Sequence, residues 1–306
     1  LITTMSKAQF NPAIIAPSVG TNSVAARTIN CDIITGSNNT VGGVSTTNIR
    51  VSAIVNDGSS PYLFSQGYNT TTSTILNTNS ILLTCTDALY PDVCLVSKQG
   101  YIWALVLCES PSRGIVLETF LWDNTSYLFT SIALQTLSTQ HMRTAVHIDS
   151  DRNDYWIGTW DEGGSQTIHT CIGRTHNNSS GPYLISSCGS GNVELDFPTN
   201  LPSTVTSLTF PDVAVYANTN SSVQSVEIYY TYLGIDPSGS TNEQNLAVQN
   251  YRIVSNVFTD ICNGNVGSTT SVVDVIDRVP GTTTTQFLFN PRIATHHETN
   301  SSTTYQ

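Results

Sequence analysis

The chain has 306 residues and a net charge of −11, and only 11% of its residues are charged while 39% are hydrophobic. This apolar share is sufficient for a folded core, so we exclude an intrinsically disordered chain. The 11 lysines and arginines stand against 22 acidic residues, which argues against nucleic acid or an anionic membrane as a partner, since both require clustered cations.

Short runs of alternating apolar and polar residues follow one another along the chain, as is typical of antiparallel strands. Turn-forming segments such as Asn56-Asp57-Gly58 and Pro237-Ser238-Gly239 separate them. In chain order, the predicted strands are Ile49 to Val55, Ile75 to Thr84, Tyr101 to Cys108, Ile115 to Trp122, Ser126 to Ile132, Thr144 to Ile148, Tyr155 to Trp160, Thr167 to Gly173, Thr204 to Phe210, Val223 to Leu233, Tyr251 to Thr259, Ser271 to Ile276 and Thr284 to Phe289.

Two other stretches have a helical period, and we predict helices at Ser131 to Met142 and at Gly239 to Gln249. The strands do not alternate regularly with helices, which excludes a wound α/β sheet. The predicted fold is therefore a single all-β, antiparallel domain over residues 1–306, with a polar tail at 295–306.

Among all-β architectures, the sequence favours a β-propeller, with a jelly roll or a β-sandwich as the alternatives. Two blocks carry this preference, Tyr101 to Asp123 and Asp154 to Arg174. Each pairs two strands across a short polar turn, as consecutive strands of a propeller blade do.

The seven cysteines are compatible with three disulfides and one further thiol, and none has the C-x-x-C spacing of zinc or thioredoxin-type sites. Cys85 and Cys94 bracket a turn that contains proline, and Cys171 and Cys188 bracket a loop of Gly, Asn and Ser. We predict both pairs as local disulfides, which places the protein outside the cell or on a virion surface.

Asn-x-Ser/Thr triplets are numerous, although a chain this rich in Asn, Ser and Thr contains such a number by chance. No apolar run is long enough to cross a bilayer, and the first residues lack the layout of a signal peptide, so we expect a mature chain or an excised fragment. The candidate glycosylation sites are Asn38, Asn69, Asn124, Asn177, Asn178, Asn220 and Asn300.

One segment concentrates oxygen ligands. Asp149, Asp151 and Asn153 have the alternating spacing with which a tight loop binds calcium. The sixth and twelfth positions of such a loop are Asp154 and Trp160, where the usual loop has Gly and Glu. A polar strand-to-strand turn is therefore favoured over a calcium site, and no other cofactor is predicted because the chain has no glycine-rich phosphate-binding loop.

No complete catalytic motif is present: there is no G-x-S-x-G sequence, and the histidines are scattered. Aromatic side chains that stack on sugars and charged side chains that bind carboxylates remain as binding material. The ligand-binding candidates are Arg143, Arg152, Tyr155, Trp156, Trp160, Glu162, Tyr229 and Tyr232.

Three features resemble a known family. A turn between Cys85 and Cys94 precedes a hydrophobic strand that ends Leu121-Trp122-Asp123-Asn124-Thr125; Tyr155-Trp-Ile-Gly-Thr-Trp160 runs into Gly163-Gly164; and Phe289-Asn290-Pro291-Arg292-Ile293 lies near the end. These resemble the globular head of the paramyxovirus attachment glycoproteins, the haemagglutinin-neuraminidase family. The resemblance implies a six-bladed propeller that attaches to a receptor.

The family's sialidase hexapeptide, Asn-Arg-Lys-Ser-Cys-Ser, has its nearest counterpart at Ile81-Leu82-Leu83-Thr84-Cys85-Thr86, where the basic and polar positions are missing. We therefore expect a receptor-binding head without enzymatic activity, whose partner is a host cell-surface glycan or protein. A structural capsid or spike protein and a sialidase-like glycoside hydrolase are the alternatives, and a homo-oligomer fits the first two roles.

Overall fold

The computed structural model describes residues 31–35, 48–56, 60–69, 74–98, 101–123, 128–138, 145–151, 155–161, 168–178, 181–185, 205–218, 225–236, 243–254, 272–279, 292–293, 298–300 and 303–305. The regular secondary structure of these residues is β-strand, arranged in four four-stranded sheets and one two-stranded hairpin. Within this part of the chain there is no helix with the length and apolarity that a membrane crossing requires.

Each four-stranded sheet is a meander of consecutive antiparallel strands. The first sheet contains β1 (Cys31–Thr35), β2 (Asn48–Asn56), β3 (Pro61–Asn69) and β4 (Thr74–Leu82). The second contains β5 (Leu89–Lys98), β6 (Tyr101–Ser110), β7 (Gly114–Asp123) and β8 (Leu128–Ser138). The third contains β9 (Val146–Ser150), β10 (Tyr155–Asp161), β11 (Ile168–Asn178) and β12 (Gly181–Ile185).

The fourth sheet contains β13 (Ser207–Asn218), β14 (Ser225–Asp236), β15 (Glu243–Val254) and β16 (Val272–Val279). A short hairpin of β17 (Glu298–Asn300) and β18 (Thr303–Tyr305) lies in the segment predicted as a polar tail.

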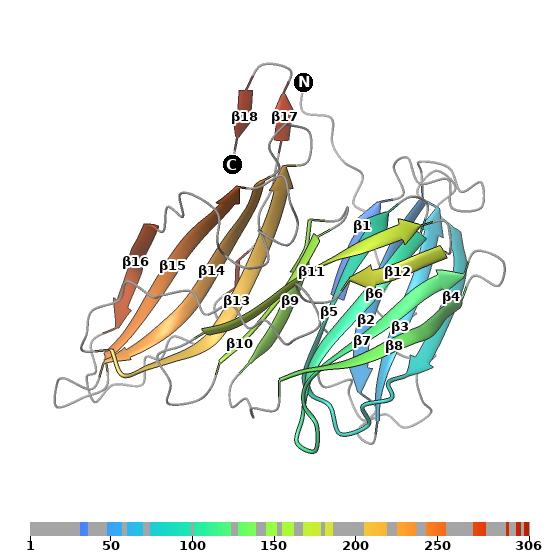
Figure 1. The fold of residues 1–306 in the computed structure, drawn as a ribbon, viewed down its shortest axis with the longest axis horizontal. Helices are drawn as coiled ribbons and strands as arrows, with labels where there is room; N and C mark the ends of the chain where they lie inside the picture. Colours follow the sequence, from blue (N-terminus) through green and yellow to red (C-terminus); the bar gives the residue numbers. More distant parts are fainter. Residues whose placement is uncertain are drawn as a thin grey trace.

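The first strand of every sheet contacts the first strand of the next, from β1 to β5, from β5 to β9 and from β9 to β13. The sheets therefore follow one another in chain order, with their first strands on the inside (Figure 1). This is the arrangement of blades in a β-propeller, so the predicted all-β, propeller-like fold is confirmed.

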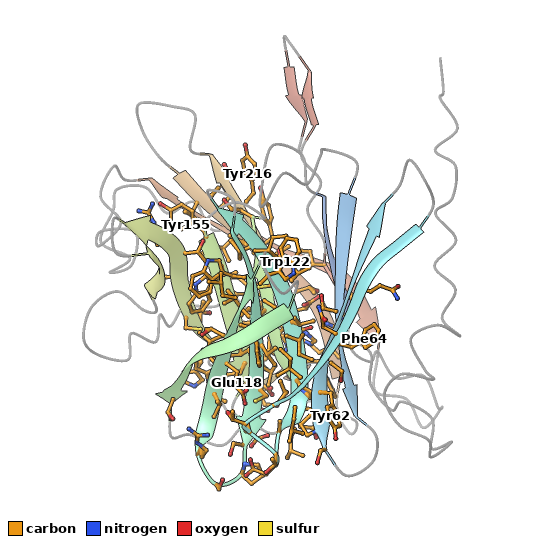
Figure 2. All side chains as sticks on the ribbon, turned by 90° about the vertical axis from the view of Figure 1, so that its right-hand side faces the viewer. Tyr62, Phe64, Glu118, Trp122, Tyr155 and Tyr216 are labelled. Atoms are coloured by element: carbon orange, nitrogen blue, oxygen red, sulfur yellow. The ribbon has the colours of Figure 1, made fainter. Side chains whose placement is uncertain are left out.

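The core consists of the layers between successive sheets, because side chains alternate between the two faces of a strand. On β6, Ile102, Ala104 and Val106 pack towards the first sheet, whereas Trp103, Leu105 and Leu107 pack towards the third. On β10, Trp156 and Trp160 point into the layer between the second and third sheets, and Tyr155 and Ile157 point towards the fourth sheet. Figure 2 shows side chains filling the space between the sheets, with Tyr155 and Trp122 among those labelled.

Both predicted hairpin blocks are confirmed, since β6 pairs with β7 and β10 pairs with β11. Both helix predictions are wrong. Leu128–Ser138 is strand β8, which pairs along β7, and Glu243–Val254 is strand β15, which pairs along β14 and β16. Pairing with neighbouring strands outweighs the local helical period at both places. The strand predicted at Thr284 to Phe289 lies outside the described residues.

Candidate functional site

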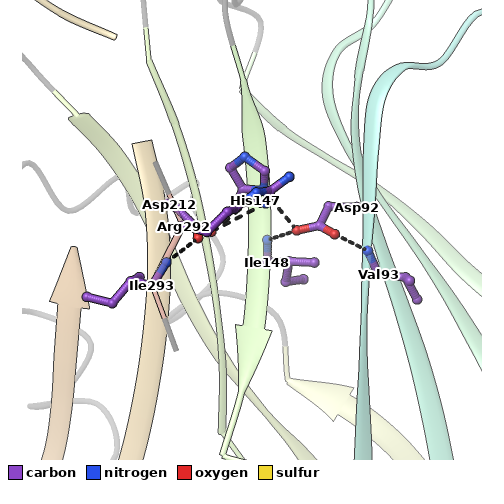
Figure 3. Close-up of polar contacts among 7 residues, drawn as sticks. All are labelled: Asp92, Val93, His147, Ile148, Asp212, Arg292 and Ile293. Carbon is purple, nitrogen blue, oxygen red and sulfur yellow. Dashed lines mark hydrogen bonds and ion pairs between the residues drawn. The ribbon is translucent and has the colours of Figure 1, made fainter. Parts of the chain in front are cut away.

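Polar side chains from three successive sheets meet at the inner strands. Asp92 lies on β5, His147 on β9 and Asp212 on β13, and each of these strands is an edge strand of its sheet. Arg292 approaches from the segment beyond the fourth sheet. We call Asp92, His147, Asp212 and Arg292 the inner-strand cluster (Figure 3).

The two aspartates stand in the same local structure. Asp92 follows Tyr90-Pro91 and Asp212 follows Phe210-Pro211, and in each strand the pairing register shifts immediately before the aspartate. The aromatic residue has a positive φ in both strands, 48° for Tyr90 and 51° for Phe210. Such bulges re-aim the following side chain and are frequent beside functional sites, and proline is tolerated there because the strand is an edge strand.

His147 lies between the two carboxylates. Its Nδ1 is 3.1 Å from Oδ2 of Asp92 and 3.7 Å from Oδ1 of Asp212. The guanidinium of Arg292 approaches the same nitrogen, with Nη1 at 2.6 Å, and lies 3.7 Å from Oδ1 of Asp212. Nδ1 cannot donate to Asp92 and accept from Arg292 at once, so the tautomer of His147 selects between these partners.

The other ring nitrogen of His147 is the distinctive atom of the cluster. Only 4% of the His147 surface is exposed, and Nε2 is buried. This nitrogen has no hydrogen-bond partner among the described residues. Buried polar atoms nearly always have a partner, so such an atom requires an explanation. With Nδ1 occupied, Nε2 is the ring atom of His147 that has no partner among the described residues, and the half-exposed Arg292 is the side from which a ligand can approach the cluster.

Backbone amides hold both carboxylates in place. The N–H groups of Val93 and Ile148 donate to Asp92, at 2.9 and 3.0 Å, and the N–H of Ile293 donates to Asp212 at 2.8 Å. Burial raises the pKa of Asp212, and this outweighs the opposite effects of His147, the Ile293 N–H and Arg292. The cluster thus combines a carboxyl that resists ionisation, a second carboxyl and an imidazole, a set suited to hydrogen bonding and to proton transfer.

Four of the predicted ligand-binding residues belong to the core instead. Tyr155, Trp156, Trp160 and Tyr232 are each at most 1% exposed, so they cannot contact a ligand at the surface. The reason is that β10 lies between the second and fourth sheets with both faces covered, while Tyr232 on β14 points into the layer between the third and fourth sheets. Trp160 stacks on His169 with ring centroids 6.0 Å apart, and Arg174 lies over the ring of Tyr155.

Tyr229 is partly exposed, and its hydroxyl donates to Glu227 at 2.7 Å. It lies on β14, outside the inner-strand cluster. The remaining predicted ligand-binding residues, Arg143, Arg152 and Glu162, lie outside the described residues.

The structure does not bring Asp149 and Asp151 together as calcium ligands. Asp149 accepts a hydrogen bond from the N–H of Val215 on β13, at 3.0 Å. Asp151 accepts one from the N–H of Tyr155, at 2.9 Å, and its own N–H donates to the Tyr155 carbonyl. Asp151 therefore closes the turn between β9 and β10, the alternative that the sequence favoured, while Asn153 lies outside the described residues. In the described part of the chain no group of His, Cys, Asp and Glu is arranged as a metal site.

The structure does not pair Cys85 with Cys94. Among the described cysteines, Cys85, Cys94, Cys108 and Cys171, no disulfide is formed. Cys94 points into the layer between the second and third sheets, whereas Cys85 packs with Cys108 in a separate cluster, so the two side chains of the predicted bridge face different neighbours. Cys188, the predicted partner of Cys171, lies outside the described residues.

Four of the predicted glycosylation positions lie in strands: Asn69 in β3, Asn177 and Asn178 in β11, and Asn300 in β17. Asn38, Asn124 and Asn220 lie outside the described residues.

Sequence reasoning missed the inner-strand cluster, although a signal was available. The motif of an aromatic residue, Pro, Asp and Val occurs at Tyr90 to Val93 and again at Phe210 to Val213. The sequence predicts a turn between Cys85 and Cys94, where β5 begins, and a strand from Thr204 to Phe210 that stops just before Pro211. Comparing the two prolines would have placed both aspartates in equivalent positions.

A scan against models of known protein families finds no match, and a search of curated proteins finds none. Among solved structures, the chain is similar to an endo-arabinase from Bacteroides thetaiotaomicron. The two are 12% identical over 83% of this chain and 82% of the other, with a TM-score of 0.37. This likeness is too weak to support an argument about function.

Proposed function

We propose that the protein binds carbohydrate at the inner-strand cluster and acts as the attachment head of a secreted or virion-surface protein. The half-exposed guanidinium of Arg292, which stands beside His147 and Asp212, is the observation that carries the proposal. The extracellular location of the protein and its kinship with paramyxovirus attachment glycoproteins remain predictions from the sequence.

The chemistry of the cluster suits sugar hydroxyls, which donate and accept hydrogen bonds at the same time. The carboxylates accept, Arg292 donates, and Nε2 of His147 does either according to its tautomer. Tyr90 is 49% exposed and lies two residues before Asp92, so it offers a ring face on which a sugar can stack. Arg292 is itself half exposed, so the cluster is open to solvent on that side.

A glycan array followed by titration calorimetry with the best glycan tests the proposal. Arg292→Ala should weaken binding at least tenfold, since a charge-assisted hydrogen bond is worth about 1.5–3 kcal/mol. Arg113→Ala is the matched control, because Arg113 is an exposed arginine in the turn between β6 and β7. It should bind like the wild type.

Thermal unfolding of the same variants separates binding from a purely structural role. If the cluster only joins the sheets, His147→Gln lowers the melting temperature and leaves the affinity of the folded protein unchanged. That result, a blank array at high valency, or equal affinity for Arg292→Ala and wild type would refute carbohydrate binding at this place.

Glycoside hydrolysis is the second candidate, favoured by the raised pKa of Asp212 next to a second carboxylate. A carboxyl that keeps its proton can protonate the leaving oxygen, while Asp92 serves as the base or nucleophile. A panel of fluorogenic glycosides that includes a sialoside tests this reaction. Asp212→Asn should reduce hydrolysis at least 100-fold, and absence of sugar release from every glycoside would leave binding alone.

A further inference from the structure

The segment between β4 and β5 is fixed on the hairpin of β6 and β7 by two carboxylates. Glu118 on β7 is fully buried and accepts hydrogen bonds from the N–H groups of Thr84 and Cys85, at 3.0 and 2.6 Å. Figure 2 shows Glu118 within the second sheet. A buried carboxyl needs hydrogen-bond donors, and here the donors are backbone N–H groups of the segment between β4 and β5. These bonds fix the segment to β7 at Thr84 and Cys85.

The second anchor follows Cys85. Asp87 accepts hydrogen bonds from the hydroxyls of Ser110 and Ser112, at 2.9 and 2.7 Å. The N–H of Ala88 donates to the carbonyl of Cys85 at 3.2 Å and closes a turn. Cys85 is therefore held on both sides against the same hairpin.

Between these anchors, Cys85 packs against Cys108. The two cysteines form a small buried cluster with Ala88 and Val116, and both are at most 1% exposed. Cys108 lies on β6, opposite Val116 on β7. A hydrogen bond from the Cys108 thiol lowers the pKa of Cys85, and the same contact together with burial raises the pKa of Cys108.

We propose that Cys85 and Cys108 form a disulfide that fixes the turn before β5 to the second sheet. The two thiols, which are free in the structure, belong to a turn and a strand that Glu118 and Asp87 already hold on one hairpin. The bond also lies close in sequence to the bulge that presents Asp92.

The oxidant is a small-molecule disulfide such as oxidised glutathione, encountered during folding, before both sulfurs are buried. The thiolate of Cys85 attacks one sulfur of the oxidant and releases one thiolate. Cys108 then loses its proton and attacks the sulfur of Cys85 in the mixed disulfide, which releases the second thiolate. The two protons lost by the cysteines end on the two released thiols, and the two electrons reduce the oxidant.

Peptide mapping of the protein secreted from eukaryotic cells tests the bond. The protein is unfolded in iodoacetamide without reductant and digested with trypsin and an Asp-specific protease together. Because Asp92 and Lys98 lie between the three cysteines, Cys85, Cys94 and Cys108 then fall on separate peptides. We expect one linked pair, Cys85 with Cys108, and alkylated Cys94.

Alkylation of both Cys85 and Cys108, or a link from either one to another cysteine, would overturn the proposal. Reduction of the wild-type protein should lower the melting temperature by about 5–10 °C. Cys108→Ser should show the lower value with or without reductant, and Cys94→Ser should keep the response of the wild type. A melting temperature of the wild type that does not respond to reductant also contradicts the bond.

Discussion

Asp92 and Asp212 approach one imidazole, but their surroundings differ. Asp92 accepts hydrogen bonds from two backbone N–H groups, those of Val93 and Ile148, whereas Asp212 accepts one, from Ile293. Each such bond favours the ionised carboxylate, and burial favours the neutral acid. The two carboxyls therefore have unequal hydrogen-bond partners, and burial raises the pKa of Asp212.

The raised pKa of Asp212 predicts a pH dependence of stability. The pKa of Asp212 in the folded protein lies above its ordinary value of 3.8, so above about pH 4 the native state binds more protons at this position than the unfolded state. The free energy of unfolding of the wild type, minus that of Asp212→Asn, should therefore fall as the pH rises from about 4. Denaturation in urea at several pH values measures the difference.

Asp87→Asn is the control of opposite sign. Hydrogen bonds, that from the Ser112 hydroxyl above all, lower the pKa of Asp87 to about 2. The stability that Asp87 contributes is present above its ordinary pKa and is lost as the pH falls towards 2, so the corresponding difference should rise with pH. A difference that does not fall with pH for Asp212→Asn, or that does not rise for Asp87→Asn, would contradict the corresponding assignment.

At the scale of the element, strand β10 depends on one glycine. Gly158 faces β6 across the layer between the second and third sheets, where a Cβ atom would lie 2.7 Å from Cδ2 of Leu107 and 2.9 Å from Sγ of Cys171. Real Cβ atoms do not approach other atoms so closely, so the neighbours would have to move. The glycine is what lets β10 approach the second sheet this closely.

We predict that Gly158→Ala lowers the free energy of unfolding by about 1–3 kcal/mol, the usual effect of overpacking a core. In a Leu107→Ala background the same substitution should cost less, since the closest atom has been removed. Chemical denaturation of the four proteins of this cycle measures both values. An equal penalty in the two backgrounds would show that the contact with Leu107 is not the cause.

The sequence predicted those elements whose pattern is local. The hairpins of β6 with β7 and of β10 with β11 were found because apolar alternation and a polar turn lie next to each other in the chain. Strand β5 was missed because Pro91 and a positive φ at Tyr90 interrupt its pattern, although the strand continues to Lys98.

The candidate site could not be predicted in the same way. Asp92, His147 and Asp212 meet only because three sheets pack in succession, and no spacing in the sequence encodes that meeting. The sequence also does not show that Trp156 and Trp160, which it predicts as ligand-binding residues, lie in the core. Aromatic side chains serve a core as well as a binding surface, and only the packing of β10 between two sheets distinguishes the two.

At the scale of the whole molecule, polar bonds join the sheets on either side of β9. The hydroxyl of Ser150 donates to the carbonyl of Leu95 on β5, at 2.7 Å, and the neighbouring Asp149 accepts from Val215 on β13. One layer further out, the hydroxyls of Thr170 and Tyr230 are 3.0 Å apart and connect the third and fourth sheets. The third sheet is thus bonded to both of its neighbours.

These bonds predict that the second, third and fourth sheets unfold together. Ser150→Ala and Asp149→Ala should each reduce stability by about 1–3 kcal/mol, because each leaves a backbone group without its partner. Both should shift the midpoint of urea denaturation without changing its slope, since the slope reports the surface exposed on unfolding. A second transition or a shallower slope would mean that a sheet separates on its own.

The two aromatic-Pro-Asp-Val bulges, on the first strands of the second and fourth sheets, repeat one backbone conformation two sheets apart. A chain with half as many sheets that paired with its own copy would present the same two aspartates across a twofold axis. Fusion of such copies would leave two aspartates with one backbone conformation and free each to acquire its own surroundings, as the unequal hydrogen bonds of Asp92 and Asp212 illustrate.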